Sequence, residues 1–239
     1  MVFAANRDEL HARPAAAAHW WADCPQILGG RDLLAGGSWL AVDRHGRLAA
    51  VTNVPSNRAA TPLKSRGHLV RDYLRGGARA EAYTAALQRE PAAYGPYNLL
   101  LFDGGAFHYV GDQAPARRLA PGTYAISNAP LGTAWPKVDF AAAALGAALT
   151  ADDPLGALFE MLANRDAHAP ADPADPAGRR ARVFIRDERF GTRASTVVLV
   201  SDTGEVRFAE RRFGRDGART GGSDYRFKPA AADAPAATR

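Results

Sequence analysis

The sequence has a single cysteine, Cys24, and no apolar run of the ~20 residues that a membrane-spanning helix needs. One thiol excludes an intrachain disulfide framework and fits a reducing compartment. The scattered histidines show no ligand spacing typical of a zinc site. Met1 leads directly into an apolar strand, unlike the start of a signal peptide. We therefore expect a cytoplasmic protein without a transmembrane segment or a bound metal.

Lysine is scarce as well, because only Lys64, Lys137 and Lys228 contribute to the 30 basic residues. Arginine therefore carries most of the positive charge, and the net charge is +5. The arginines are dispersed along the chain, which favours a solvated surface; a face for nucleic acid or an anionic ligand is the alternative. Aromatic residues do not alternate with basic ones as they do on a single-strand binding platform, so we expect no nucleic-acid partner.

Common nucleotide-binding and hydrolase motifs are missing. The glycine pairs at 29–30 and 36–37 form neither a phosphate-binding loop nor a dinucleotide fingerprint. No Gly-x-Ser-x-Gly segment is present to place a catalytic serine on a sharp turn. Any ligand site must therefore be built differently.

The most distinctive pattern lies at the start of the chain. Residues 2–5 predict a short buried strand, and Asn6, Arg7, Asp8 and Glu9 follow it without a turn residue. Such groups are costly to bury unless they satisfy one another. Solvated charges at a strand end are the simpler interpretation, and a pre-organised polar site at the mouth of a sheet is the sharper one.

Alternation, turn residues and apolar periodicity predict three β-hairpins and two pairs of helices. The hairpins are expected over 38–53, 97–110 and 194–213, and the helices over 66–75, 79–89, 138–149 and 154–164. This order fits an α+β protein with two mostly antiparallel sheets stacked face to face and helices outside. We expect one domain over 1–213 and a flexible tail over 214–239.

Three tryptophans offer large apolar faces. Trp20, Trp21 and Trp39 fit core packing, and a lining for a flat hydrophobic ligand is the alternative. The Cys24-Pro25 dipeptide fits a plain loop, or less simply a thiolate that responds to haem.

Several short segments, taken together and in order, strongly resemble the NRDE family, also called the transport and Golgi organization family. The first is Asn6-Arg7-Asp8-Glu9, followed by Arg13-Pro14. The others are Gly30-Arg31-Asp32, Gly36-Gly37-Ser38-Trp39-Leu40, Thr52-Asn53, Ser65-Arg66-Gly67, Tyr97-Asn98-Leu99-Leu100, Ser127-Asn128, Trp135-Pro136-Lys137-Val138 and Gly191-Thr192-Arg193-Ala194-Ser195-Thr196.

The resemblance implies a fold similar to that of N-terminal-nucleophile hydrolases, a four-layer αββα sandwich. In the related choloylglycine-type amidases an arginine and an aspartate follow the first strand, a position that Arg7 and Asp8 resemble. Asn53 and Asn128 resemble oxyanion donors by their placement at strand ends. Arg193 resembles a later arginine that orients the site. By analogy of position, these five are the candidate catalytic residues.

One departure from the family pattern concerns the nucleophile. Family chains usually begin with Met-Cys and an additional strand, whereas this sequence begins Met1-Val2-Phe3. Cys24 follows the signature, and the given sequence therefore has no N-terminal nucleophile. The expectation is either lost chemistry or a start further upstream, and a missing strand would leave an exposed sheet edge.

The leading hypothesis is a protein that binds a hydrophobic, anionic small molecule. The resemblance implies haem trafficking, with haem as cargo, or acyl-lipid and coenzyme A metabolism. The expected ligand-binding residues are Asn6, Arg7, Asp8, Trp39, Asn128 and Arg193. An amidohydrolase with an N-terminal cysteine and a factor that organises the secretory pathway are the alternatives. We also expect Arg7 to be paired and buried, and Arg212 to be exposed.

Overall fold

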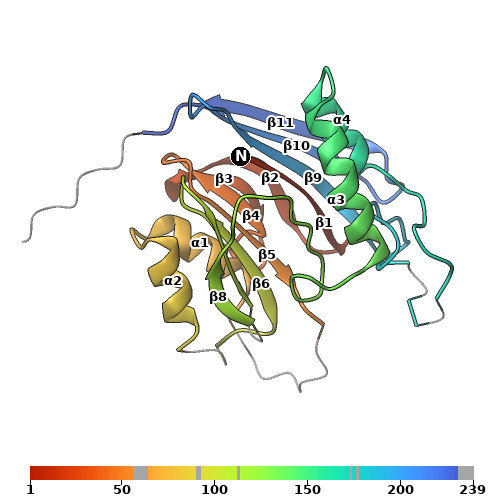
Figure 1. Ribbon diagram of the computed structural model, residues 1–239, viewed down its shortest axis with the longest axis horizontal. Helices are drawn as coiled ribbons and strands as arrows, with labels where there is room; N and C mark the ends of the chain where they lie inside the picture. Colours follow the sequence, from red (N-terminus) through yellow and green to blue (C-terminus); the bar gives the residue numbers. More distant parts are fainter. Residues whose placement is uncertain (56–63, 90–92, 112–113, 173, 176–177, 231–239) are drawn as a thin grey trace, which may run out of the picture.

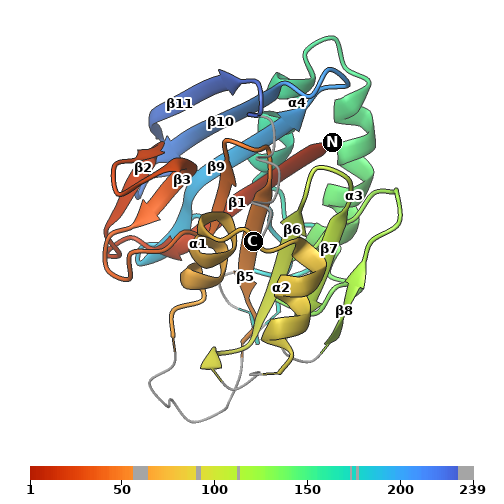
Figure 2. The same ribbon diagram turned by 90° about the vertical axis from the view of Figure 1, so that its left-hand side faces the viewer.

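The computed structural model describes residues 1–55, 64–89, 93–111, 114–172, 174–175 and 178–230. Within them, two antiparallel sheets of four and seven strands and four helices form an α+β protein (Figures 1 and 2). No helix in these ranges combines the length and apolar character that crossing a bilayer requires.

The four-stranded sheet, called sheet A here, combines strands from the two ends of the described chain. Neighbouring strands pair antiparallel in the order β1 (Val2–Leu10), β9 (Phe190–Val200), β10 (Val206–Phe213) and β11 (Arg219–Phe227). β1 and β11 are therefore its outer strands. The register of β1 against β9 shifts between Arg7 and Asp8, which leaves Arg193 without a direct partner on β1.

The seven-stranded sheet, called sheet B, is a meander in which each strand pairs with the next along the chain. Its strands are β2 (Ala15–Trp21), β3 (Cys24–Asp32), β4 (Leu40–Asp43), β5 (Leu48–Asn53), β6 (Tyr97–Phe102), β7 (Phe107–Gly111) and β8 (Ala114–Arg118). The turns after β4 and β6 contain Gly46 and Gly104 at φ +78° and +94°, a conformation that favours glycine.

The helices cover the outer faces of the two sheets. α1 (Gly67–Arg75) packs against β3, β4 and β5, and α2 (Ala80–Leu87) packs against β7 and β8 of sheet B. α3 (Pro136–Leu149) packs on α4 (Pro154–Leu162), which contacts β1 and β9 of sheet A. In Figure 1 the two helix pairs lie on opposite sides of the sheets.

Three apolar clusters hold these layers together. One joins sheet B to its helices and includes Leu69 of α1 and Val51 of β5. The middle cluster joins the sheets through residues such as Leu28 and Phe208. The third, which includes Phe159 of α4, joins sheet A to its helices. The layers are therefore helices, sheet B, sheet A and helices.

The predicted two-sheet arrangement, the three hairpins and the four helices are confirmed. The prediction of a tail that is flexible from residue 214 is wrong. Residues 219–227 form β11, which pairs with β10 along its length. Tyr225 and Phe227 of β11 pack against the middle cluster, and this burial outweighs the low strand propensity of its glycines. Residues 231–239 of the predicted tail lie outside the described part of the chain.

Two further expectations at the start of the chain need correction. The first strand does not end at residue 5, because β1 continues through the polar signature to Leu10. Cys24 is not in a loop but begins β3, where it is buried in the cluster beneath α1. At both places the paired strand is therefore longer than the polarity of the local sequence indicates.

Candidate functional site

A cavity of about 1440 Å³ lies between the sheets and extends around the outer edge of β1 to α3. Strands of both sheets, α3 and the segment 124–131 contribute to its lining. Its basic lining residues are Arg7, Arg13, Arg31, Lys64, Arg66, Lys137, Arg179, Arg180, Arg193 and Arg212. Its acidic ones are Asp8, Glu9, Asp32, Asp175 and Glu210. Among the described residues the lining therefore carries an excess of positive charge.

Alternation along β1 divides the signature between two layers. Phe3 packs in the middle cluster between the sheets, so Arg7 and Glu9, at the same parity, face sheet B. Val2 and Ala4 pack in the cluster beneath α3 and α4. Asn6 therefore faces that helix layer, and the four polar groups do not satisfy one another as one cluster.

Arg7 is largely buried, with 12% of its side chain exposed. Its Nη2 lies 3.9 Å from Oε2 of Glu9, which makes a loose ion pair. Burial lowers the pKa of Arg7, and the negative charge of Glu9 opposes that shift. Arg7 thus brings a weakly paired cation to the cavity.

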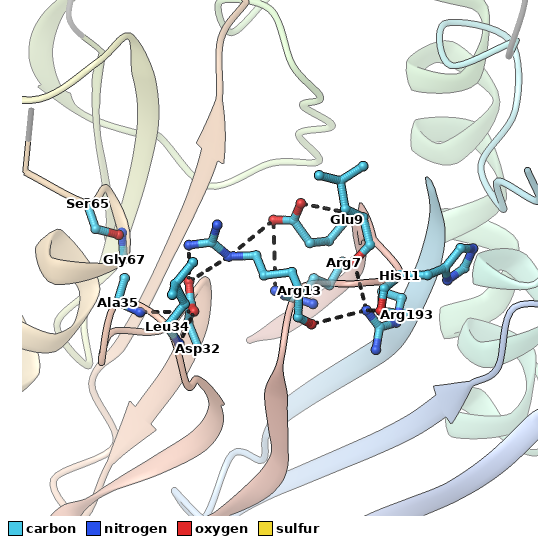
Figure 3. Close-up of polar contacts among 11 residues, drawn as sticks. Arg7, Glu9, His11, Arg13, Asp32, Leu34, Ala35, Ser65, Gly67 and Arg193 are labelled. Atoms are coloured by element: carbon cyan, nitrogen blue, oxygen red, sulfur yellow. Dashed lines mark hydrogen bonds and ion pairs between the residues drawn. The ribbon is translucent and has the colours of Figure 1, made fainter. Parts of the chain in front are cut away.

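Arg13 links the end of the signature to the last residue of β3, Asp32. Its Nη2 donates to Oδ2 of Asp32 at 2.6 Å, and its Nε lies 3.8 Å from Oε2 of Glu9 (Figure 3). Oδ1 of Asp32 accepts the backbone N–H groups of Leu34 and Ala35. Burial opposes ionisation of Asp32, but these hydrogen bonds together hold its pKa below the usual value.

Arg193 meets the same turn from β9. Its Nη1 donates to the backbone carbonyls of Leu10, His11 and Arg13 at 2.9, 3.1 and 3.4 Å (Figure 3). Because one guanidinium satisfies three carbonyls, Arg193 holds the turn that follows β1. These contacts lie in the turn after the signature, so Arg193 has a positioning contact there rather than a contact to Asp8.

Asn6 and Asp8 make hydrogen bonds on the other face of β1. Nδ2 of Asn6 donates to the carbonyls of Leu162 and Val183 at 2.8 and 3.0 Å, and its Oδ1 accepts Oγ of Ser195 at 2.6 Å. Oδ1 of Asp8 accepts the hydroxyl of Thr192 at 2.7 Å. Asn6 therefore joins β1 to the helix layer and to β9, which is a structural task.

Burial raises the pKa of Asp8, while the positive charge of Lys137 and the hydrogen bond from Thr192 oppose the shift. Lys137 is the second residue of α3 and is itself buried, which lowers its pKa. The sequence analysis did not single out Lys137 as a site residue. Its position after Trp135-Pro136 was the available signal, because proline at a helix start fixes where the next side chain lies.

Asn53 and Asn128 meet at a different part of the cavity. Nδ2 of Asn128 donates to the backbone carbonyl of Asn53 at 2.9 Å. Beside them, Asn98 donates to Oγ1 of Thr52 and to the carbonyls of Ser127 and Ala129. Among the described residues, no hydrogen bond joins this amide group to Arg7 or Arg193, so Asn53 and Asn128 form a separate polar group in the lining.

The three tryptophans lie in different surroundings. Trp39 lines the cavity. Trp21 is buried in the cluster beneath α1 and donates Nε1 to the carbonyl of Gly29 at 3.0 Å. Trp20 packs on Phe227 outside the lining. Of the three, Trp39 alone is placed to contact a ligand in the described cavity.

Glu210 and Arg212 of β10 also face the cavity, although sequence reasoning did not assign them. Oε1 of Glu210 accepts the backbone N–H of Ala18 on β2 at 3.0 Å, which links the sheets. Nε of Arg212 is buried and has no hydrogen-bond partner among the described residues. The prediction that Arg212 is exposed is therefore wrong, since the alternation of Phe208, Glu210 and Arg212 turns all three inward.

Comparison with known proteins agrees with this signature. Residues 1–215 match the family described as Transport and Golgi organisation 2. The Transport and Golgi organization protein 2 homolog of Bos taurus is 34% identical over 236 residues, covering 88% of this chain and 86% of the relative. The Homo sapiens homolog is 33% identical with the same coverage. The Drosophila melanogaster protein is 24% identical over 88% of this chain and 85% of its own. The chain therefore belongs to the Transport and Golgi organisation 2 family, the family of the Asn-Arg-Asp-Glu signature at residues 6–9.

Proposed function

We propose that this protein binds an amphipathic, anionic small molecule between its two sheets. The observation that carries the proposal is the cavity of about 1440 Å³, whose lining combines an excess of basic groups with apolar side chains. Typical ligand pockets occupy ~300–1,000 Å³, so this one suits a large ligand.

The polar part of such a ligand is best received near Arg7 and Arg212, because neither guanidinium is fully paired. Guanidinium groups bind carboxylates and phosphates through directed, charge-assisted hydrogen bonds. The candidate ligand-binding residues Asn6, Asp8 and Arg193 support this region by fixing β1 and the turn after it.

The apolar part finds its partners elsewhere in the lining. Trp39 lies directly before β4 and Leu100 in β6 of sheet B, Leu131 in the segment before α3, and Val138 and Leu145 in α3 itself. Burying an acyl chain or a flat ring system against these side chains contributes free energy in proportion to the apolar area removed from water.

We favour an acyl lipid or acyl-coenzyme A as the ligand class, which gives a role in acyl-lipid metabolism. The cationic side chains match phosphate and carboxylate groups, and the apolar wall matches a chain. Haem as cargo is the second ligand class, since Trp39 offers a flat face and Met161 a thioether within the lining. Titration separates the two.

The test is a calorimetric titration of the full chain with palmitoyl-coenzyme A below its micelle concentration, with haem titrated in parallel by its Soret band. We expect one palmitoyl-coenzyme A to bind per chain with a Kd of about micromolar order. Saturable binding of haem alone would move the proposal to haem trafficking. Binding of neither ligand would overturn the proposal.

A matched pair of tryptophan variants locates the site. Trp39 and Trp20 are both half-buried aromatic residues of the middle cluster, but only Trp39 lines the cavity among the described residues. Trp39→Ala should weaken palmitoyl-coenzyme A binding, whereas Trp20→Ala should lower stability without changing the affinity of the folded protein. Equal affinity of both variants would contradict a site between the sheets.

A second candidate function is amide hydrolysis on a fold similar to that of N-terminal-nucleophile hydrolases. Two antiparallel sheets between helix layers favour this likeness, and so does the position of Arg7, Asp8 and Arg193 at the ends of adjacent strands. Cys24 is packed beneath α1, outside the cavity lining. Release of glycine from N-palmitoylglycine by the full chain would support hydrolysis; binding without release would retain the first proposal.

The name of the relatives concerns transport and Golgi organization, and an organising role in the secretory pathway is a third candidate. The cytoplasmic location expected from the sequence stays a prediction. Cell fractionation distinguishes these two possibilities. An organising role in the secretory pathway requires the protein in the membrane fraction, whereas the predicted cytoplasmic location requires it in the cytosolic fraction.

A further inference from the structure

The inner face of sheet A is arranged in three rows across its strands. The pairing registers place Phe3, Val198, Phe208 and Tyr225 side by side in an apolar row. The next row is Ala5, Thr196, Glu210 and Ser223, and the third is Arg7, Ala194, Arg212 and Gly221. Hydrogen bonds from Ser223 and Tyr225 to the carbonyl of Ala18 on β2 show that this face is turned to sheet B.

The third row holds two cations on either side of a small residue. Arg7 and Arg212 are both direct neighbours of Ala194, so their Cα atoms lie two strand spacings apart, roughly 10 Å. Two arginine side chains that start at this separation are long enough to reach a single group above Ala194. All three residues line the cavity.

Gly221 on β11 leaves room for one of these cations. A Cβ atom at this position would collide with Nη2 of Arg212. The guanidinium therefore lies against the backbone of β11, beneath the cavity, and the side chain is held on the inner face.

The buried cations lack sufficient negative charge from the protein. Nε of Arg212 has no acceptor among the described residues, and Arg7 has only the ion pair of 3.9 Å with Glu9. Glu210 in the adjoining row makes no hydrogen bond to either arginine among the described residues, because its Oε1 accepts the N–H of Ala18 on β2. Burial raises the pKa of Glu210, while this hydrogen bond and the charges of Arg212 and Arg7 oppose the shift. Oγ1 of Thr196, also in that row, is a second buried atom without a partner. An unpaired buried cation is costly and is normally matched by an anion.

Resting on the proposed function, we propose that Arg7 and Arg212 form the subsite that receives the oxyanion of the ligand, directly above Ala194. The anionic head then lies between the sheets, and the apolar part extends toward Trp39 and α3. Arg212 lies outside the Asn-Arg-Asp-Glu signature, and this assigns it a specificity role for a phosphate or carboxylate head.

The test uses inorganic phosphate as the probe and the full chain. Phosphate should raise the melting temperature of the wild-type protein more than sodium chloride at equal ionic strength does. Arg212→Gln should weaken the apparent phosphate affinity about 10- to 100-fold, as expected for a lost charged hydrogen bond. In the absence of phosphate, Arg212→Gln should melt at the same temperature as the wild type or higher. Loss of an arginine with a structural role would instead lower the melting temperature.

Arg207→Gln is the matched control. Arg207 lies on the same strand, but its Nη2 pairs with Oδ2 of Asp224 at 2.7 Å, and its parity turns it away from the cavity. This variant should keep the phosphate response. Loss of the response in Arg207→Gln, or its retention in Arg212→Gln, overturns the proposal.

Two further arms complete the experiment. If Arg212→Gln does not fold, Arg212→Lys keeps the charge but loses Nε, and its phosphate response should still fall; an unchanged response overturns the proposal. The same series with butyrate in place of phosphate identifies the head group. The anion that matches the subsite should give the larger rise in melting temperature that is lost in Arg212→Gln. Binding of palmitoyl-coenzyme A with equal affinity to wild type and Arg212→Gln would refute this subsite while retaining the proposed function.

Discussion

At the scale of single residues, neighbouring positions of the signature have different tasks. Asn6 bonds to the end of α4 and to β9, whereas Arg7 faces sheet B and the cavity. Arg193 supports the turn between β1 and β2. The signature is therefore not one polar cluster: Asn6 and Asp8 bond on one face of β1, whereas Arg7 and Glu9 form a loose ion pair on the other.

Arg7→Ala should destabilise the protein more than Arg212→Ala. The first change removes one of the two arginines that pair with Glu9, while the second removes a guanidinium whose buried Nε has no acceptor in the described chain. We expect a difference of about 1 kcal/mol or more in the free energy of unfolding, which is roughly 2–4 °C in melting temperature at this chain length. Thermal unfolding without added phosphate measures it, and equal melting temperatures would contradict the assignment.

Asp8→Asn should make stability less dependent on pH. Because burial raises the pKa of folded Asp8 above its ordinary value of 3.8, the native state binds more protons than the unfolded state above that pH. The wild type therefore loses stability relative to Asp8→Asn as the pH rises from 3.8 through the raised pKa.

Asparagine keeps an acceptor for the hydroxyl of Thr192, so the comparison isolates the charge. Urea unfolding of both proteins at a series of pH values provides the measurement. A difference in the free energy of unfolding that is constant across this range would exclude a raised pKa for Asp8.

At the scale of elements, the hairpins β4–β5, β6–β7 and β9–β10 could be predicted because their alternation and their turn glycines are local signals. The buried stripe of α1, which includes Leu69 and Tyr73, could be predicted from its spacing. β2 and β11 could not, because they are rich in alanine or in glycine and arginine. Pairing with β3 and β10 and burial between the sheets decide their structure instead.

Replacement of Tyr225 tests whether β11 is part of the core. Tyr225→Ala should lower the free energy of unfolding by about 2–4 kcal/mol, because its ring packs in the middle cluster and its hydroxyl donates to Ala18. Arg226→Ala is the control, since Arg226 is exposed on the opposite face of β11. The same denaturant midpoint for both variants would contradict a role of β11 in the core and would support a flexible tail.

At the scale of the whole molecule, the layers bring distant segments to one cavity. Arg7 and Arg212 lie at opposite ends of the described chain, yet both neighbour Ala194. The residue types of the site could be predicted from the signature and from strand ends. Their partners could not, because these depend on which face each strand turns inward and on the order β1-β9-β10-β11.

The basic excess of the lining predicts a binding step that depends on salt. Raising sodium chloride from about 50 to 500 mM should weaken palmitoyl-coenzyme A binding about five- to tenfold, because ions screen the cationic lining from the ligand head. Calorimetry at both salt concentrations measures the change. Affinity that rises with salt would indicate that apolar burial alone drives binding.

The most direct test of the central claim is a crystal structure of the full chain with palmitoyl-coenzyme A bound. The account predicts a phosphate of the ligand within hydrogen-bond distance of the guanidinium of Arg7 or Arg212, above Ala194, and the acyl chain in the cavity near Trp39. A ligand bound outside the two sheets, or one whose phosphates lie far from both arginines, would contradict it.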